Sequence, residues 1–211
     1  MKNDNNIIQK INNFYNSNLG YYQDLENQIA SETVGRNCHH WVCVLNIIVR
    51  LYDVKTYLEI GVHNGTSMSY VVNQDENKID CYGIDLFEQT IKQYLRDSLS
   101  RDNTLENIQK NNKSNSLLNL IAGNSFSKDT ISKVSDLNID LLFIDGDHSY
   151  KGISNDFFNY APLVRKGGLI VIDDYNKRWP DVLRFVDNDI SSNEYFKCGV
   201  FLDNEFILLK I

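Results

Sequence analysis

This chain of 211 residues lacks several features that mark other functional classes. Its four cysteines show no C-x-x-C spacing, no apolar run is long enough to cross a bilayer, and the polar start MKNDNNIIQK has no signal-peptide core. An excess of positive charge is also missing, because the net charge is −7, which argues against nucleic acid or an anionic membrane as the main partner. We therefore expect a cytoplasmic protein with reduced thiols and one sizeable globular core.

One short segment has residue types that bind zinc in other proteins, namely Cys38, His39, His40 and Cys43. Apolar residues that include Trp41 and Ile48 lie among and after them at helical spacing. This pattern indicates an amphipathic helix over residues 38–52 with buried thiols, so we do not expect a structural zinc site.

Short apolar runs alternate with amphipathic segments along most of the chain. Such alternation predicts an α/β fold, in which helices cover both faces of a doubly wound and mostly parallel sheet. The last two runs flank Asp203 and Asn204 and predict an antiparallel hairpin at the C-terminus. We expect seven strands, at residues 56–60, 80–85, 116–123, 140–147, 169–173, 195–202 and 205–211.

The helical segments define the expected boundaries of the core. The Asn-rich residues 1–37 predict one or two short helices outside the main core, acting as a lid, a dimer contact or a solvated extension, and residues 38–211 form the main domain. Apolar residues every fourth position predict a helix over 87–99. Another helix places Ile153, Phe157, Tyr160 and Val164 on one face, and Pro162 kinks or shortens it.

The segment LEIGVHNGTS (58–67) combines a strand end, a glycine loop and a helix start. Gly61 permits a tight turn and the close approach of a ligand, and Gly65 lets the helix begin nearby. The spacing is G-x-x-x-G and differs from the G-x-G-x-x-G of dinucleotide sites. His63 occupies the place of the middle glycine, which disfavours a pyrophosphate ligand.

Two carboxylates accompany this loop. Glu59 is placed to attract an ammonium group, and Asp85, at the end of the next strand, is spaced to accept hydrogen bonds from ribose hydroxyls. Each feature alone is also compatible with a simple turn or a helix cap. Together, in this order and on strand ends, they favour a nucleoside ligand.

Two acidic clusters follow directly on apolar strands: Asp145 and Asp147 in LLFIDGDHSY, and Asp173 and Asp174 in GGLIVIDDY. If these strands are parallel neighbours, the carboxylates emerge side by side at one edge of the sheet. Carboxylates this close repel one another and raise one another's pKa unless a cation, a proton or a ligand neutralises them. The clusters therefore predict a divalent metal site or an acid/base centre.

These motifs, together with GID, AGNS and the hairpin, resemble class I S-adenosylmethionine-dependent methyltransferases. The resemblance covers roughly residues 38–211 and is most specific to small metal-dependent O-methyltransferases of the macrocin (sugar) and catechol types. It implies a Rossmann-like fold, S-adenosyl-L-methionine as cofactor, and Mg²⁺ or Mn²⁺. By position it assigns cofactor binding to Glu59, Gly61, His63, Asn64, Gly65, Thr66, Ser67, Asp85, Asn124, Ser125 and Asp145, and metal binding to Asp145, Asp173 and Asp174.

The chemistry of these residues agrees with the resemblance. Three carboxylates suit a hard cation, which would lower the pKa of a substrate hydroxyl and orient it toward the sulfonium methyl. Two residues are candidates for the base that removes the hydroxyl proton, Asp147 and His148; a supporting role near the metal and a helix cap are their respective alternatives.

The sequence thus predicts a metal-assisted O-methyltransferase for a small hydroxylated acceptor, without nucleic-acid or membrane partners. A sugar is the first choice, because sugar-type relatives have Asp where Asp174 stands, and a phenol or catechol is the second. Tyr175, Arg178 and Trp179, with Trp41, are candidates for the walls of an acceptor pocket, although ordinary packing would also explain them. The alternatives are a nicotinamide-dependent oxidoreductase and a non-catalytic cofactor-binding protein of the same fold.

Overall fold

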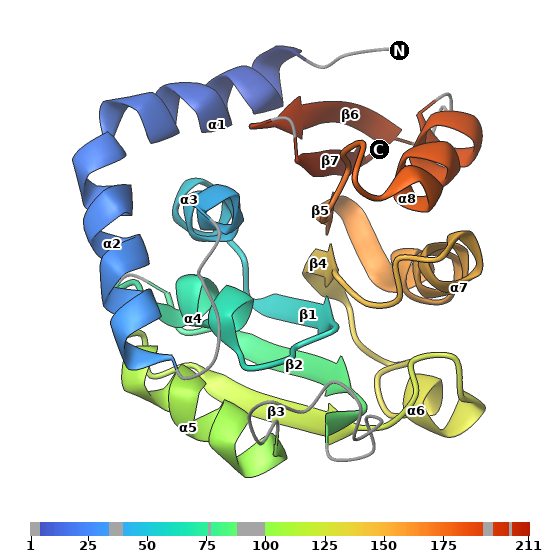
Figure 1. The fold of residues 1–211 in the computed structure, drawn as a ribbon, viewed down its shortest axis with the longest axis horizontal. Coiled ribbons are helices and arrows are strands. Elements are labelled where there is room, and N and C mark those ends of the chain that lie inside the picture. Colours follow the sequence, from blue (N-terminus) through green and yellow to red (C-terminus); the bar gives the residue numbers. More distant parts are fainter. Residues whose placement is uncertain (1–4, 34–39, 76, 88–99, 192–195, 203) are drawn as a thin grey trace.

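The apolar runs of the chain form one seven-stranded sheet. The computed structural model describes residues 5–33, 40–75, 77–87, 100–191, 196–202 and 204–211. The strand order is β3-β2-β1-β4-β5-β7-β6, parallel from β3 to β5, with β7 antiparallel to both β5 and β6 (Figure 1). This confirms the predicted fold class. The strands are β1 (Thr56–Ile60), β2 (Asp80–Asp85), β3 (Leu117–Ala122), β4 (Ile139–Ile144), β5 (Val164–Ile172), β6 (Phe196–Phe201) and β7 (Glu205–Lys210).

Helices lie on both faces of this sheet, α1 to α5 on one face and α6 to α8 on the other (Figure 1). Each face has its own cluster of buried apolar side chains, as expected for a parallel sheet that is covered on both sides. No helix among the described residues is long and apolar enough to span a bilayer. The helices are α1 (Asn5–Ser17), α2 (Leu19–Glu32), α3 (Cys43–Leu51), α4 (Thr66–Val72), α5 (Arg101–Asn111), α6 (Lys128–Ser132), α7 (Tyr150–Tyr160) and α8 (Pro180–Phe185), with 3₁₀ turns at His40–Val42 and Ala161–Leu163 and a π turn at Val186–Ile190.

The N-terminal helices belong to the core. Ile11 of α1 and Ile29 of α2 are fully buried in the same apolar cluster as the residues of α3, and α1 packs against both α3 and β6. A side chain on Gly199 of β6 would overlap Ile8, so this glycine lets α1 approach the strand closely. The prediction that this segment packs outside the main core is therefore wrong.

Pro162 shortens the helix after β4, as predicted, but the placing of Val164 on its helical face is wrong. Helix α7 ends at Tyr160, Pro162 lies in a 3₁₀ turn, and Val164 already begins β5 instead of extending the helical face. Three carbonyls of this turn region accept hydrogen bonds from Lys210 Nζ of the hairpin, a contact that local periodicity does not contain. Two other predictions concern residues that lie wholly or partly outside the described part of the chain: the helix over 87–99, and the start of the helix over 38–52, which includes Cys38 and His39.

Candidate active site

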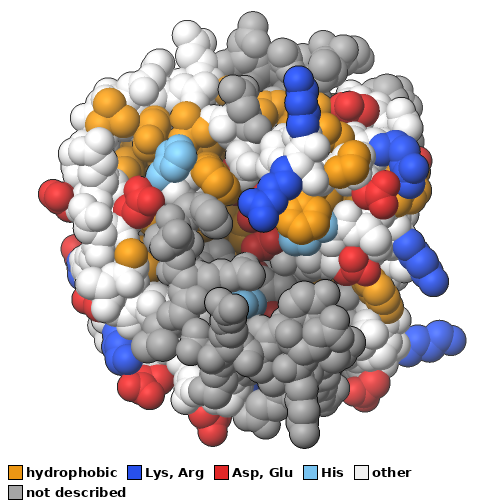
Figure 2. All heavy atoms as spheres, in the orientation of Figure 1, with side chains coloured by type: hydrophobic (Ala, Val, Ile, Leu, Met, Phe, Trp, Pro, Cys, Tyr) orange, Lys and Arg blue, Asp and Glu red, His pale blue; other side chains and the backbone are white. Residues whose placement is uncertain are grey.

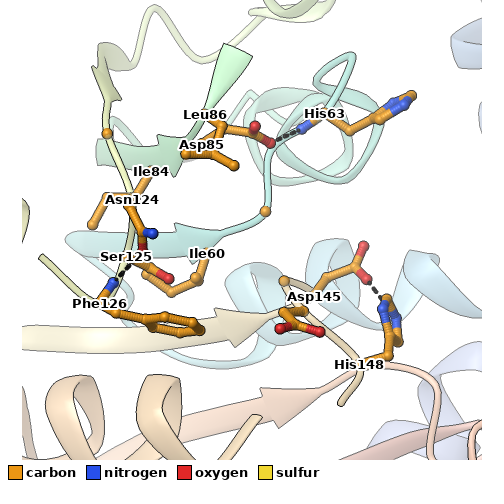
Figure 3. Close-up of a pocket in the computed structure, with 14 residues that line it drawn as sticks. Ile60, His63, Ile84, Asp85, Leu86, Asn124, Ser125, Phe126, Asp145 and His148 are labelled. Carbon is orange, nitrogen blue, oxygen red and sulfur yellow. Dashed lines mark hydrogen bonds and ion pairs between the residues drawn. The ribbon is translucent and has the colours of Figure 1, made fainter. Parts of the chain in front are cut away.

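The loops at the carboxyl ends of β1 to β4 enclose a pocket of about 500 Å³ (Figures 2 and 3). It lies where the strand order changes direction between β1 and β4, which is the usual ligand position in such sheets. In Figure 2, acidic and histidine side chains are visible in a hollow near the centre of the view. Eight predicted site residues line the pocket: Gly61, His63, Asp85, Asn124, Ser125, Asp145, Asp147 and His148.

Five other predicted cofactor residues lie behind this lining: Glu59, Asn64, Gly65, Thr66 and Ser67. The glycine loop nevertheless shapes the pocket. Gly61 has a φ of 90°, and a side chain there would overlap the backbone carbonyl of Asp145. Gly65 has a φ of 84° and packs against Ile108 of α5. The two glycines therefore allow the loop to fit between β4 and α5, and the approach of Gly61 to the backbone at Asp145 joins the two motifs found in the sequence.

Glu59 is fully buried at the end of β1. Its carboxylate accepts hydrogen bonds from the Ser67 hydroxyl and from the Tyr57 hydroxyl, the latter at 2.9 Å. Burial raises the pKa of Glu59 to about 8, although both hydrogen bonds act in the opposite direction. The carboxyl is thus neutral at pH 7 until a positive charge comes near it.

Asp85, at the end of β2, holds two loops of the pocket together. One carboxylate oxygen accepts the backbone N–H of His63 at 2.7 Å, and the other accepts that of Phe87 at 3.1 Å. Figure 3 shows Asp85 on the opposite side of the pocket from His148. Each carboxylate oxygen has further lone pairs, so Asp85 can still accept hydrogen bonds from a ligand.

The loop after β3 forms another wall of the pocket. Asn124 turns back on its own backbone, because its side-chain oxygen accepts the N–H of Phe126 at 2.8 Å, and the Ser125 carbonyl accepts the Tyr160 hydroxyl at 2.8 Å. Asp156 of α7, which sequence analysis missed, is fully buried beneath this wall and beside Gly146. Burial raises its pKa to about 7.

The two acidic clusters meet as predicted, because β4 and β5 are parallel neighbours. Ligand atoms of Asp145, His148 and Asp174 all lie within 4.8 Å of one another. Nε2 of His148 is 2.8 Å from Oδ2 of Asp174 and 3.4 Å from Oδ1 of Asp145. Burial alone would lower the pKa of His148, but contact with the two carboxylates raises it to about 10. Burial also raises the pKa of Asp145, against the effect of His148.

Asp173 is not a member of this group of three. Its carboxylate accepts hydrogen bonds from the Asn204 amide at 2.8 Å and from the backbone N–H of Asp174 at 2.6 Å, and it contacts the fully buried Glu205. Burial and the neighbouring carboxylates raise the pKa of both Asp173 and Glu205 well above the ordinary range. Glu205 was not among the predicted site residues, although its position as an acidic residue at the start of the apolar run EFILLKI is a signal in the sequence.

The remaining base candidate, Asp147, is exposed at the start of α7. Its carboxylate accepts hydrogen bonds from the backbone N–H and hydroxyl of Ser149, at 2.9 and 3.0 Å. Ser149 in turn caps α7 by accepting the N–H of Gly152 at 3.1 Å. Asp147 therefore orders the loop that carries His148, while His148 itself lies against Asp145 and Asp174.

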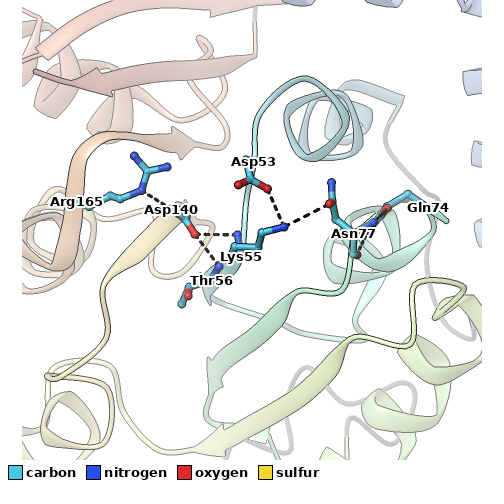
Figure 4. A network of polar contacts seen from close by, with 7 residues as sticks. All are labelled: Asp53, Lys55, Thr56, Gln74, Asn77, Asp140 and Arg165. Atoms are coloured by element: carbon cyan, nitrogen blue, oxygen red, sulfur yellow. Dashed lines mark hydrogen bonds and ion pairs between the residues drawn. The ribbon is translucent and has the colours of Figure 1, made fainter.

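A network of polar contacts joins the strands at their amino-terminal ends, opposite the pocket (Figure 4). Asp140 of β4 accepts the backbone N–H groups of Lys55 and Thr56 at 2.8 and 2.9 Å and pairs with Arg165 of β5. These contacts fasten the starts of β1, β4 and β5 to one another. The pocket is thus built on strands whose far ends are fixed.

Comparison with known proteins agrees with this geometry. Residues 58–175 match a family described as a methyltransferase domain. The chain is 33% identical over 188 residues to an uncharacterized protein of Acanthamoeba polyphaga mimivirus, a match that covers 85% of this chain and 80% of that protein.

Two solved structures show the same fold. An O-methyltransferase from Bacillus cereus in complex with SAH has a TM-score of 0.62 at 16% identity, with 91% of this chain and 89% of that chain covered. A TDP-rhamnose 3′-O-methyltransferase of calicheamicin biosynthesis has a TM-score of 0.61 at 14% identity, with 80% and 78% covered. From its sequence match and its fold, the chain belongs to the methyltransferase domain family.

Proposed function

We propose that this protein transfers the methyl group of S-adenosylmethionine to a hydroxyl oxygen of a small acceptor, assisted by a divalent cation. One observation supports the proposal most strongly. A single pocket extends from Asp85, which was predicted to accept hydrogen bonds from the ribose hydroxyls, to Asp145 and His148 of the acidic group. A cofactor that fills the pocket from Asp85 would bring its reactive end close to the residues that can bind and deprotonate an acceptor. Such positioning is a large part of what methyl transfer requires.

The charges in the pocket suit this cofactor. S-adenosylmethionine carries a sulfonium and an ammonium group, and the lining includes the carboxylates of Asp85, Asp145 and Asp147. Glu59 lies behind the glycine loop, where an ammonium group would favour its ionised form. The related Bacillus cereus enzyme was solved with SAH, which supports the same class of ligand here.

The acidic group also fits a divalent cation. Asp145 and Asp174 offer carboxylate oxygens that lie within 4.8 Å of each other and of a ring nitrogen of His148, which is left for the acceptor proton. Asp173 was predicted as a ligand; Asn204 and the backbone N–H of Asp174 both donate to its Oδ1, so Oδ2 is the oxygen that would bind the cation. Oxygen donors favour Mg²⁺ or Mn²⁺. When bound, the cation would lower the pKa of the acceptor hydroxyl and orient it.

His148 is the better placed of the two base candidates. It lies in the acidic group, whereas the carboxylate of Asp147 is engaged with Ser149. With a pKa of about 10, His148 holds a proton at neutral pH, and only a neutral imidazole can act as a base. A cation bound to the carboxylates of Asp145 and Asp174 would favour the loss of this proton and leave a neutral imidazole that can act as the base. The acceptor proton then moves to His148, the C–S bond breaks and the O–CH₃ bond forms.

A sugar hydroxyl is the favoured acceptor and a phenol or catechol is the second choice. Asp174 supports the sugar, because sugar-type relatives have Asp at this position, and so does the fold similarity to the TDP-rhamnose enzyme. A nicotinamide-dependent oxidoreductase is not favoured, because the family match is to methyltransferases. A cytoplasmic location, the absence of a nucleic-acid partner and a homodimer are further predictions from the sequence.

The test is transfer of tritium from methyl-labelled S-adenosylmethionine to a panel of sugars and catechols, with Mg²⁺ or with EDTA. We expect labelled product with Mg²⁺, and at least a roughly hundredfold lower rate with EDTA or in Asp174→Ala. Undiminished transfer after chelation would contradict the role of the cation. Binding of S-adenosylmethionine without transfer to any acceptor would instead support the non-catalytic alternative.

A further inference from the structure

The loop between Asp174 and Pro180 carries two basic residues. It follows directly on the group formed by Asp145, His148 and Asp174, which we call the acidic centre. The sequence of the loop is Tyr-Asn-Lys-Arg-Trp, and Lys177 and Arg178 are both exposed. Neither forms an ion pair with a carboxylate among the described residues, whereas Arg165 and Arg184 do. A protein with a net charge of −7 thus keeps two unpaired cations at this position.

Hydrogen bonds fix the conformation of this loop. The backbone N–H of Tyr175 donates to the Asn204 carbonyl at 2.7 Å, and the Asn176 side chain donates to the Asn204 side chain at 2.6 Å. The Asn176 side chain also accepts the N–H of Arg178 at 2.9 Å, and its backbone carbonyl accepts that of Trp179 at 3.1 Å. The backbone positions of Arg178 and Trp179 are therefore set by the turn of the C-terminal hairpin.

Trp179 forms a wall of the acidic centre. Its ring stacks on His148 with centroids 4.2 Å apart and an interplanar angle of 25°. The guanidinium carbon of Arg178 lies 5.7 Å from the centre of the Trp179 ring. This is within the range of a cation–π contact, which favours an ordered guanidinium and leaves N–H donors available for another group.

The charges around the acidic centre determine whether an anionic acceptor can bind there. Even with a divalent cation on Asp145 and Asp174, the exposed Asp147 and a net charge of −7 disfavour an acceptor that carries negative charge, and this repulsion acts over roughly 8–10 Å at moderate salt. A neutral acceptor needs no cation there. An anionic acceptor needs one beside the carboxylates, and the planar guanidinium of arginine matches the oxygens of phosphate and carboxylate groups.

We infer that Arg178, supported by Lys177, binds an anionic group of the acceptor, a phosphate or a carboxylate, while the hydroxyl to be methylated lies at the acidic centre beside Trp179 and His148. The inference rests on the proposed function and narrows its substrate class to anionic hydroxylated acceptors. Arg178 is in this role a specificity-determining residue.

The experiment uses two pairs of probes that differ by one anionic group: glucose 6-phosphate with glucose, and 3,4-dihydroxybenzoate with catechol. Calorimetry measures their affinity for the full chain loaded with S-adenosylhomocysteine and Mg²⁺ at low salt. We expect the anionic member of at least one pair to bind about tenfold more tightly or better, as for a charge-assisted hydrogen bond. Arg178→Gln should reduce this ratio to within about threefold, and Lys177→Gln should reduce it less.

Arg184→Gln is the matched control, because it removes the same charge nearby. Arg184 pairs with Asp181 at 3.3 Å and lies 4.4 Å above the Tyr150 ring, so this variant should keep the wild-type ratio. Equal affinity for both members of both pairs, or failure of both anionic probes to bind at millimolar concentration, would overturn the inference. So would a ratio that Arg178→Gln leaves unchanged, or that Arg184→Gln reduces equally.

The preceding titration with S-adenosylhomocysteine tests the proposed function separately. Without binding of that ligand, the proposed function fails, whatever the probes show. If S-adenosylhomocysteine does bind, methyl transfer to neutral and anionic acceptors at equal rates would leave the proposed function intact and refute the role of Arg178.

Discussion

Glu59 should lose a proton when S-adenosylmethionine binds. In the free protein its carboxyl is fully buried and has a pKa of about 8, so it is neutral at pH 7. The ammonium group of the cofactor, placed near the glycine loop, favours the ionised carboxylate and lowers this pKa. Cofactor binding and proton release are therefore linked.

The expected number of protons follows from the pKa. A group with a pKa of about 8 is roughly 0.9 protonated at pH 7 and roughly 0.1 at pH 9. If the bound cofactor returns the pKa to its ordinary value of 4.5, about 0.9 proton leaves Glu59 at pH 7 and about 0.1 at pH 9.

The same pKa affects folding. Because the folded-state pKa is raised, Glu59 disfavours the folded protein increasingly from about pH 4.5 to about pH 8 and has no such effect at lower pH. The free energy of unfolding of Glu59→Gln should fall less than that of the wild type over this interval.

Calorimetric titration at pH 7, in buffers with different ionisation enthalpies, measures the protons released. Glu59→Gln should release about 0.9 proton fewer than the wild type. The amino group of the cofactor also titrates near this pH, but it contributes equally to both proteins and cancels in the difference. Glu106→Gln, an exposed change on α5, is the control and should match the wild type. If the wild type and Glu59→Gln release the same number of protons, the ammonium does not reach Glu59.

Three further predictions concern the sheet, the glycine loop and the cation. Asp140→Ala should lower the free energy of unfolding by about 2 kcal/mol, because two backbone N–H groups lose their acceptor. The control Asp53→Ala, at an exposed position, should change it by less than about 0.5 kcal/mol. Equal effects of the two variants in urea denaturation would refute the role of the network. Gly61→Ala should lower the free energy of unfolding by more than about 2 kcal/mol and impair cofactor binding, because the added Cβ meets the Asp145 carbonyl. Gly20→Ala in α2 has open space around the new Cβ and should raise the free energy of unfolding by up to about 1 kcal/mol. Thermal unfolding of both variants tests this contrast. Asp174→Ala should weaken Mn²⁺ binding at least about tenfold in electron paramagnetic resonance titrations, and unchanged affinity would remove Asp174 from the cation site.

Elements set by local pattern could be predicted from the sequence. The bounds of β1 and β2 agree with the predicted ones, because short apolar runs and turn residues define them locally. The course of the chain at Val164 could not be predicted in this way. There Lys210, distant in the sequence, binds the carbonyls of the turn, and the apolar period of α7 ends with Pro162.

In the candidate site, too, the placement of the backbone could be predicted from the sequence, and the orientation of the side chains could not. The meeting of Asp145 with Asp174 followed from the placement of two strand ends in a parallel sheet. The orientation of individual side chains did not, since Asp173 and Asp174 are adjacent in sequence and yet face different partners. Asn204 and Glu205 determine that difference, and they come from a hairpin whose packing only the tertiary structure specifies.

The central claim is that the pocket binds S-adenosylmethionine with Asp85 as an anchor. The most direct measurement is a calorimetric titration of the folded wild type and of Asp85→Asn with this cofactor, after circular dichroism has verified that both are folded. We predict saturable binding by the wild type and at least about tenfold weaker binding by the variant, because an ionised acceptor is lost. No binding by the folded wild type, or equal affinity of the two proteins, would contradict the claim.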